Sequence, residues 1–256
     1  MSNIGLEYYY LSGKDIPLNN HKLGVIKQLT LNNFIDLNIE MNDFIQPFIL
    51  NKKIMLNRSS DIDKLLEDIG DLSFLFLYEQ LSKQPIISML LKSLSIIYGS
   101  NIYVDKKTIA IIVENNNITI TDDNFNILSN VVCEMMGIDR NDIEVPEIKE
   151  EMSDIEKEFE RRRQKYLEMQ KGNKPKKNEG YTILDIANIV IHSSNFSYNE
   201  VFNMTIYQLK NSFRVLMKKD NYTVNLLHRI SQKFDTSKEK FVHWTDEVKL
   251  DISSQN

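Results

Sequence analysis

A long charged segment, residues 147–179, is the feature that most constrains the fold of this chain. It reads EIKEEMSDIEKEFERRRQKYLEMQKGNKPKKNE, with many charges and few large apolar residues. Such a segment cannot bury a hydrophobic face, so it divides the chain into an N-terminal and a C-terminal part. Because Glu158 and Arg162 are four residues apart, an exposed helix is expected, ending at Gly172 in a flexible connector. The predicted organisation is an N-terminal domain (1–146), this charged helix and linker (147–179), a C-terminal helical module (180–245) and a polar tail (246–256).

The hydrophobic pattern predicts an α+β fold that is mainly α. Runs of aromatic and branched residues predict short strands, and apolar residues at helical spacing predict helices. A small antiparallel meander is expected where apolar strands alternate with the turns DKK and ENNN. The expected elements are strands at 8–11 and 23–26, helices at 31–48, 60–69, 71–82 and 85–98 with Gly99 as C-cap, the meander at 101–121, and a helix that Asp122 caps and Gly137 ends.

Helix-start signals dominate the C-terminal module. In a capping box, a Ser or Thr at the helix start and an acid or amide three residues later satisfy each other's backbone N–H groups. Together these boxes predict several short helices rather than one long rod. Two apolar stripes, 206–217 and 226–234, are expected to bury each other in antiparallel helices, with a face for a partner helix as the alternative. The boxes are Ser60/Asp63, Ser153/Glu156, Thr182/Asp185, Ser197/Glu200, Thr205/Gln208 and Thr236/Glu239.

The sequence contains no recognisable enzyme motif. It has no glycine-rich phosphate loop, no nucleophile elbow and no HExxH, and its four histidines lack metal-ligand spacing. The acid pairs Asp61/Asp63 and Asp122/Asp123 stand at expected helix starts, where capping explains them better than acid–base chemistry. Cys133 follows two valines on an apolar face and is expected to be a buried filler rather than a reactive thiol. We expect no catalytic residue, metal or cofactor, and an enzyme without a recognisable motif is the remaining alternative.

Charge and hydropathy narrow the classes of partner. The sequence has 31 Lys and Arg residues and 36 Asp and Glu residues, which gives a net charge of −5. A surface devoted to nucleic acid or to an anionic membrane is therefore not expected, nor is a signal peptide or a membrane span. One local exception is a basic strip comprising Arg161, Arg162, Arg163 and Lys165. It is interpreted as part of a solvated helix, with a contact to RNA phosphates or to a host protein as the alternative.

The C-terminal sequence resembles a known family. The run FNMTIYQL at 202–209, followed by Phe213, Arg214, Tyr222 and a closing His243-Trp244, resembles the tail assembly chaperones of siphovirus-type phages of low-GC Gram-positive hosts. The upstream TILDIANIV and the N-terminal IKQLTL, Phe34-Ile35 and Pro47-Phe48 are also similar to that family. Two positions depart from its pattern, since Met204 replaces a usual Leu and Asn211 replaces a frequent acid.

This resemblance implies a non-enzymatic helper that binds and solubilises the tape measure protein during tail assembly. It further implies location in the host cytoplasm outside the mature virion, self-association, and the tail tube protein as a further candidate partner. From the charge and hydropathy we expect no membrane or nucleic-acid partner. We expect the exposed side chains of the module to contact the partner, namely Tyr207, Lys210, Arg214 and Trp244. The alternative function is a phage regulatory or anti-defence protein that binds RNA or a host protein through the basic strip.

Overall fold

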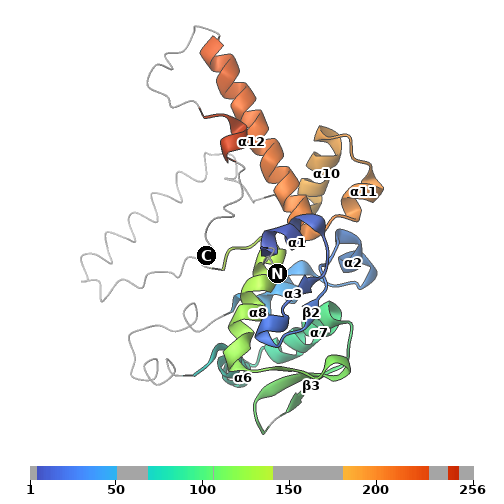
Figure 1. The fold of residues 1–256 in the computed structure, drawn as a ribbon, viewed down its shortest axis with the longest axis vertical. Coiled ribbons are helices and arrows are strands. Elements are labelled where there is room, and N and C mark those ends of the chain that lie inside the picture. The colour runs from blue at the N-terminus through green and yellow to red at the C-terminus, as the bar shows by residue number, and fades with distance from the viewer. Residues whose placement is uncertain (1–4, 51–68, 106, 141–180, 231–241, 248–256) are drawn as a thin grey trace, which may run out of the picture.

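A computed structural model describes residues 5–50, 69–105, 107–140, 181–230 and 242–247 of the chain. These residues are mainly helical and include two small antiparallel sheets, which confirms the predicted fold class (Figure 1). The expected charged helix and linker, the helical region from Ser60 and most of the polar tail lie outside the described residues. The predicted boundaries after residues 146 and 179 also lie there and stay predictions.

The described elements follow one another along the chain as short helices with strands between them. The N-terminal part contains α1 (Leu6–Ser12), β1 (Ile16–Pro17), η1 (Asn19–His21), β2 (Val25–Ile26), α2 (Leu31–Asp36), α3 (Met41–Ile49), α6 (Asp71–Ser82), α7 (Ile86–Tyr98), β3 (Ile102–Asp105), β4 (Ala110–Val113), η2 (Glu114–Asn116), β5 (Ile118–Ile120) and α8 (Asp122–Met135). The C-terminal part contains α10 (Ile183–Ser193), α11 (Tyr198–Phe202), α12 (Ile206–Ile230) and α13 (Trp244–Glu247).

The core of the N-terminal body lies between α3, α7 and α8. Helix α3 packs against both of the others, and α6 packs on α7 and α8. Phe48 of α3 is fully buried, with its ring centroid 6.1 Å from that of Phe44 and 6.5 Å from that of Phe125 on α8. Burying such rings supplies much of the hydrophobic stabilisation of a small helical body. The N-terminal body is therefore a well-packed unit against which the other elements are positioned.

Several predicted elements are confirmed with their boundaries. Helices α6 and α7 occupy the expected ranges, and Gly99 ends α7 with a left-handed φ of 59°. Strands β3, β4 and β5 form the expected meander, with Ile111 paired to Val104 on one side and to Ile120 on the other. Strand β2 lies within the predicted strand 23–26 and pairs with β1.

Three N-terminal predictions are wrong. Residues 8–11 are not a strand but part of helix α1, because its aromatic residues pack against other helices and this packing overrides their strand preference. The single helix expected over 31–48 is divided into α2 and α3, since Asn38 adopts a left-handed φ of 48°.

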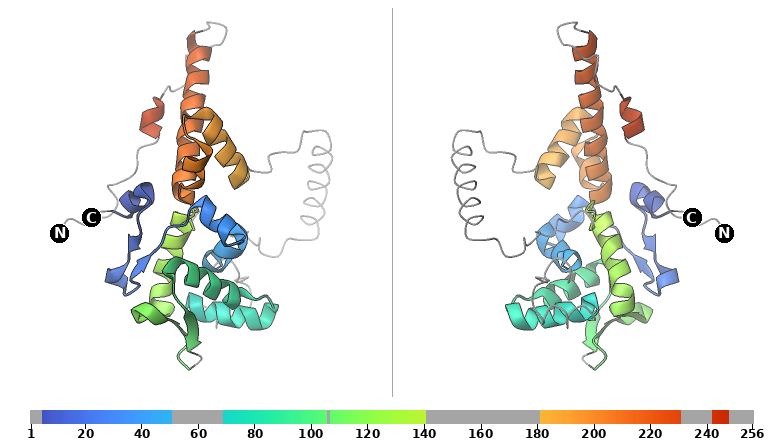
Figure 2. Two further views of the ribbon diagram at one scale, coloured as in Figure 1. Left: turned by 90° about the vertical axis from the view of Figure 1, so that its right-hand side faces the viewer. Right: turned by 90° about the vertical axis from the view of Figure 1, so that its left-hand side faces the viewer.

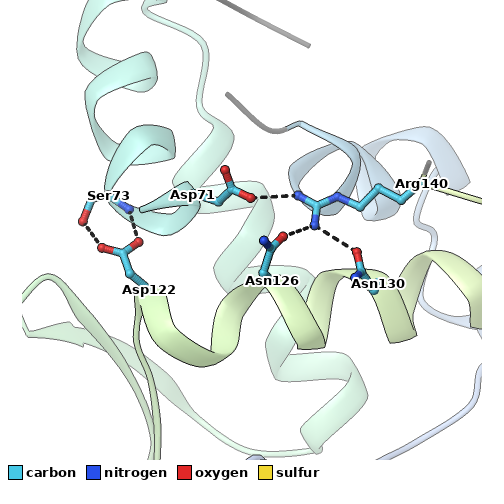
Figure 3. Close-up of polar contacts among 6 residues, drawn as sticks. All are labelled: Asp71, Ser73, Asp122, Asn126, Asn130 and Arg140. Carbon is cyan, nitrogen blue, oxygen red and sulfur yellow. Dashed lines mark hydrogen bonds and ion pairs between the residues drawn. The ribbon is translucent and has the colours of Figure 1, made fainter. Parts of the chain in front are cut away.

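The third concerns Asp122, which does not cap its own helix. The N-cap of α8 is Thr121, which forms a capping box with Asn124. The Asp122 carboxylate instead accepts hydrogen bonds from the backbone N–H and the hydroxyl of Ser73, in the first turn of α6, with the N–H at 2.9 Å (Figure 3). Because the first turn of a helix has unpaired N–H groups, Asp122 caps α6 from a helix 49 residues away.

The C-terminal part contains one long helix, which corrects the prediction of short helices only. Helix α12 has 25 residues and runs without a break through the first apolar stripe and into the second as far as Ile230, so the described parts of the two stripes lie on one helix and not on two antiparallel ones. Neither Gly nor Pro occurs between Ile206 and Ile230, so nothing in the sequence stops the helix there. The capping boxes at Thr182, Ser197 and Thr205 are present, and those at residues 60, 153 and 236 lie outside the described residues.

Candidate partner-binding surface

The first turns of α12 are fixed to the N-terminal body. The backbone N–H of Ile206 donates to the carbonyl oxygen of Leu29 at 3.2 Å, and Thr205 pairs with Thr30 in a β-bridge. Ile206 and Leu209 are fully buried in the same hydrophobic cluster as the N-terminal helices. The direction of α12 is therefore set by backbone and side-chain contacts with the body, and its far end projects from this anchor (Figures 1 and 2).

Two polar side chains of α12 reinforce this anchor. The Lys210 ammonium donates to the carbonyl oxygen of Met136 at 2.7 Å, just past the end of α8. Gln208 donates from Nε2 to the carbonyl oxygen of Leu11 at 2.8 Å, at the end of α1. Cations favour the negative end of a helix dipole, so Lys210 stabilises the carboxyl end of α8. Burial lowers the pKa of Lys210, which reflects the cost of bringing its charge into this contact.

An acidic groove of about 470 Å³ lies where α1, α8 and α12 meet. The Tyr10 hydroxyl donates to Glu134 at 2.8 Å, and the Tyr10 ring lies 5.1 Å from that of Tyr207. Burial raises the pKa of Glu134, and the nearby carboxylates of Glu7 and Asp139 raise it further, although the bond from Tyr10 acts in the opposite direction. Three carboxylates thus share this groove, which disfavours anionic ligands there.

The four partner-binding residues predicted from the sequence lie in different environments. Tyr207 is half-buried at the acidic groove, and Lys210 is half-buried in its bond to Met136. Trp244 is half-buried at the start of α13, with its ring 5.9 Å from His243. Only Arg214 is exposed, so the expectation that all four are exposed is wrong. The basic strip, Arg161 to Arg163 with Lys165, lies outside the described residues.

A continuous seam runs along α12. We call "the α12 seam" the positions that alternate at spacings of three and four residues, which are Ile206, Leu209, Phe213, Leu216, Asp220, Thr223, Leu227 and Ile230. This spacing keeps all of them on one side of the helix and is the heptad pattern by which helices pack along their length. The first four are buried or half-buried, whereas Leu227 and Ile230 are 61% and 66% exposed. The same apolar face is therefore covered near the body and uncovered at the far end.

The extent of α10 explains where the burial of the α12 seam ends. Helix α10 packs on α12, and the ring of Tyr181, just before α10, lies 5.4 Å from that of Phe213. Beyond Leu216 the helix continues to Ile230, which at 1.5 Å per residue is roughly 20 Å. Figures 1 and 2 show this part of α12 extending past α10. Helix α13 lies against another side of α12, where the ring of His243 is 4.7 Å from Tyr222.

The apolar pattern of the sequence assigns Leu227 and Ile230 to a separate stripe, and it does not reveal that they continue the buried face. Asp220 and Thr223 are likewise missed as seam positions. The alternation of three- and four-residue steps from 206 to 230 is the signal that identifies them, provided that the run is not divided at the polar KKDN stretch.

Other polar clusters have structural roles. Arg140 pairs with Asp71 of α6 at 3.4 Å and donates to the side chains of Asn126 and Asn130 on α8, which ties the two helices together (Figure 3). Cys133 is fully buried, as expected, and burial raises the pKa of its thiol to about 11. Within the described residues no group of three or more His, Cys, Asp and Glu side chains is arranged to hold a metal ion. None of the described helices combines the length and hydropathy that crossing a membrane requires.

Comparison with known proteins finds a likeness at the C-terminal part. Residues 173–249 match a phage-derived family described as the YomV second domain. The matched stretch contains α10 to α13 and hence the whole α12 seam. This likeness is consistent with a phage protein. No curated protein and no solved structure matches the chain.

Proposed function

We propose that this protein is a non-enzymatic phage tail assembly chaperone that holds a helical client, the tape measure protein, against the uncovered end of the α12 seam. The observation that carries the proposal is that one helix face is apolar and buried at its anchored end and, beyond the polar Asp220 and Thr223, ends in two exposed apolar positions, Leu227 and Ile230. An exposed apolar stripe with heptad spacing is a typical docking face for an amphipathic helix.

The geometry suits a holding role. A long helical client exposes apolar stripes that cause aggregation when they are uncovered. A rigid, projecting helix can cover such a stripe without enclosing the client, because its base is fixed by Lys210 and by the burial of Leu209. The likeness to a phage-derived family and the sequence resemblance support a phage setting. Such a chaperone would act in the host cytoplasm, would be absent from the virion, and would self-associate along the client.

The proposal is tested by co-expressing the full chain with the tape measure protein encoded beside its gene. Soluble client and its co-elution with the chain are measured for the wild type, Leu227→Glu and Ile35→Glu. Ile35 on α2 is 55% exposed, close to the 61% of Leu227, so it is a matched control for adding a charge at an exposed apolar site. We expect the wild type and Ile35→Glu to keep the client soluble and Leu227→Glu to lose it.

Full activity of Leu227→Glu would show that the seam does not hold the client. Co-elution of the chain with RNA or a host protein, lost in high salt and on replacing Arg161, Arg162 and Arg163 by Ala, would instead support the regulatory or anti-defence alternative. Phosphate contacts weaken steeply with salt, whereas apolar contacts between helices do not, so the two outcomes are distinguishable.

A further inference from the structure

We infer that Asp220 selects the partner of the α12 seam, so that the docked helix carries a Lys or Arg facing this carboxylate. The inference rests on the proposed function, because it describes the client of the same seam. Asp220 occupies a seam position between the half-buried Leu216 and the exposed Leu227, and it is itself exposed. It is the one charged residue among the eight positions of the α12 seam.

The helix provides Asp220 with no cation of its own. Side chains on a helix meet at separations of three and four residues, and those neighbours of Asp220 are Leu216, Met217, Thr223 and Val224. Lys218 and Lys219 are adjacent in sequence but project to other sides of the helix. Among the described residues, Asp220 has no ion-pair partner.

Docking of an apolar helix changes the environment of this carboxylate. The seam around Asp220 would be covered, and a charge that loses water without gaining a partner destabilises the complex. A Lys or Arg on the facing helix would supply the partner and fix the register, as single polar residues at core positions of coiled coils do. A Glu or Asp at that place would be repelled. The partner class is therefore a helix with a heptad apolar stripe interrupted by a basic residue.

The same carboxylate argues against an anionic lipid surface as the occupant. Lipid phosphates against this face would lie next to the negatively charged Asp220, and the neighbouring seam positions, Thr223 and the apolar side chains, offer no cation to bind them. Basic residues on the polar face are what membrane-surface helices use to bind such lipids. A protein helix satisfies both the apolar and the charged parts of the seam.

The inference is tested by titrating isotope-labelled full chain with three synthetic peptides to millimolar concentration and following amide chemical shifts. The peptides are three heptads long, with the same apolar stripe, and differ at one central stripe position that is Lys, Gln or Glu. We expect the Lys peptide to bind best and the Glu peptide worst, with roughly a fivefold difference in Kd between them. Asp220→Lys should reverse this order, whereas Asp36→Lys, an equal change of charge at an exposed site on α2, should keep it.

The outcomes separate this inference from the proposed function. Equal binding of all three peptides, lost in Leu227→Glu, would leave the seam as the docking site and overturn the role of Asp220. If no peptide binds the wild type at millimolar concentration, the role of Asp220 is overturned, and the co-expression test alone decides the proposed function. Sedimentation with phosphatidylglycerol–phosphatidylcholine vesicles tests the membrane alternative. If the chain binds vesicles but no peptide, and Leu227→Glu abolishes the vesicle binding, the seam is a membrane-binding face instead.

Discussion

Replacing Lys210 by Met should loosen the attachment of α12 to the body. Met keeps most of the aliphatic length but cannot donate the 2.7 Å hydrogen bond to the Met136 carbonyl. A hydrogen bond from a charged group contributes about 1.5–3 kcal/mol. The lowered pKa of Lys210 shows that burying the ammonium already costs part of this gain. We therefore expect a net destabilisation of about 1–2 kcal/mol.

Urea unfolding of the full chain measures this loss, and Lys219→Met is the matched control. Lys219 lies on the same helix and is exposed, so its replacement should change the free energy of unfolding by less than about 0.5 kcal/mol. The midpoint of Lys210→Met should fall with an unchanged slope, because the surface exposed on unfolding is the same. Equal midpoints for the two variants would refute the idea that Lys210 anchors α12 to α8.

Three further predictions concern the body. Asp122→Ala should lower the free energy of unfolding by about 1–2 kcal/mol because α6 loses its cap. Asp123→Ala changes a residue in the same turn that has no bond to Ser73, so thermal unfolding should show a smaller loss of stability for this variant. The raised pKa of Glu134 means that its charged form is disfavoured in the folded state, so its contribution to stability improves as pH falls through the folded pKa towards the unfolded value. Unfolding of Glu134→Gln at several pH values should therefore show a stability advantage at neutral pH that shrinks on acidification, and a constant difference would contradict this assignment. Cys133 should react with a thiol reagent only in denaturant, since it is fully buried and its thiol has a raised pKa, and rapid labelling of the native chain would contradict its burial.

The sequence predicts best those elements whose ends carry a local signal. Gly99 ends α7, and Thr182 and Ser197 begin α10 and α11, because capping depends on residues within one turn. Elements decided by distant contacts are predicted poorly. The sequence of residues 8–11 predicts a strand, but Tyr10 contacts α8 and α12 and the segment is helical. Asp122 is predicted to cap its own helix, but its partner is Ser73 of α6.

The same limit applies to the candidate site. Local polarity at Lys218, Lys219 and Asp220 favours a turn, but a helix anchored at one end continues through such residues when no Gly or Pro breaks it. A lysine beside an apolar stripe is usually solvated, which is why the sequence predicts that Lys210 faces a partner. Its true neighbour, the end of α8, is 74 residues away and could not be inferred from helical spacing.

The small apolar area at the exposed end of the seam limits the affinity of a single copy of the chain for a helix. Full burial of an aliphatic side chain contributes about 1.5–3 kcal/mol, and Val224, beside the seam, Leu227 and Ile230 are already one-third to one-half covered. Their complete burial by a partner would contribute about 3–5 kcal/mol, which is comparable to the lower estimates of the free energy lost on association. A single seam therefore binds a helix weakly, and stable coverage requires several copies on one long, repetitive client, where linkage multiplies affinity. The polar positions Asp220 and Thr223 keep the exposed stripe short, which limits aggregation of the free chain at the expense of affinity per contact.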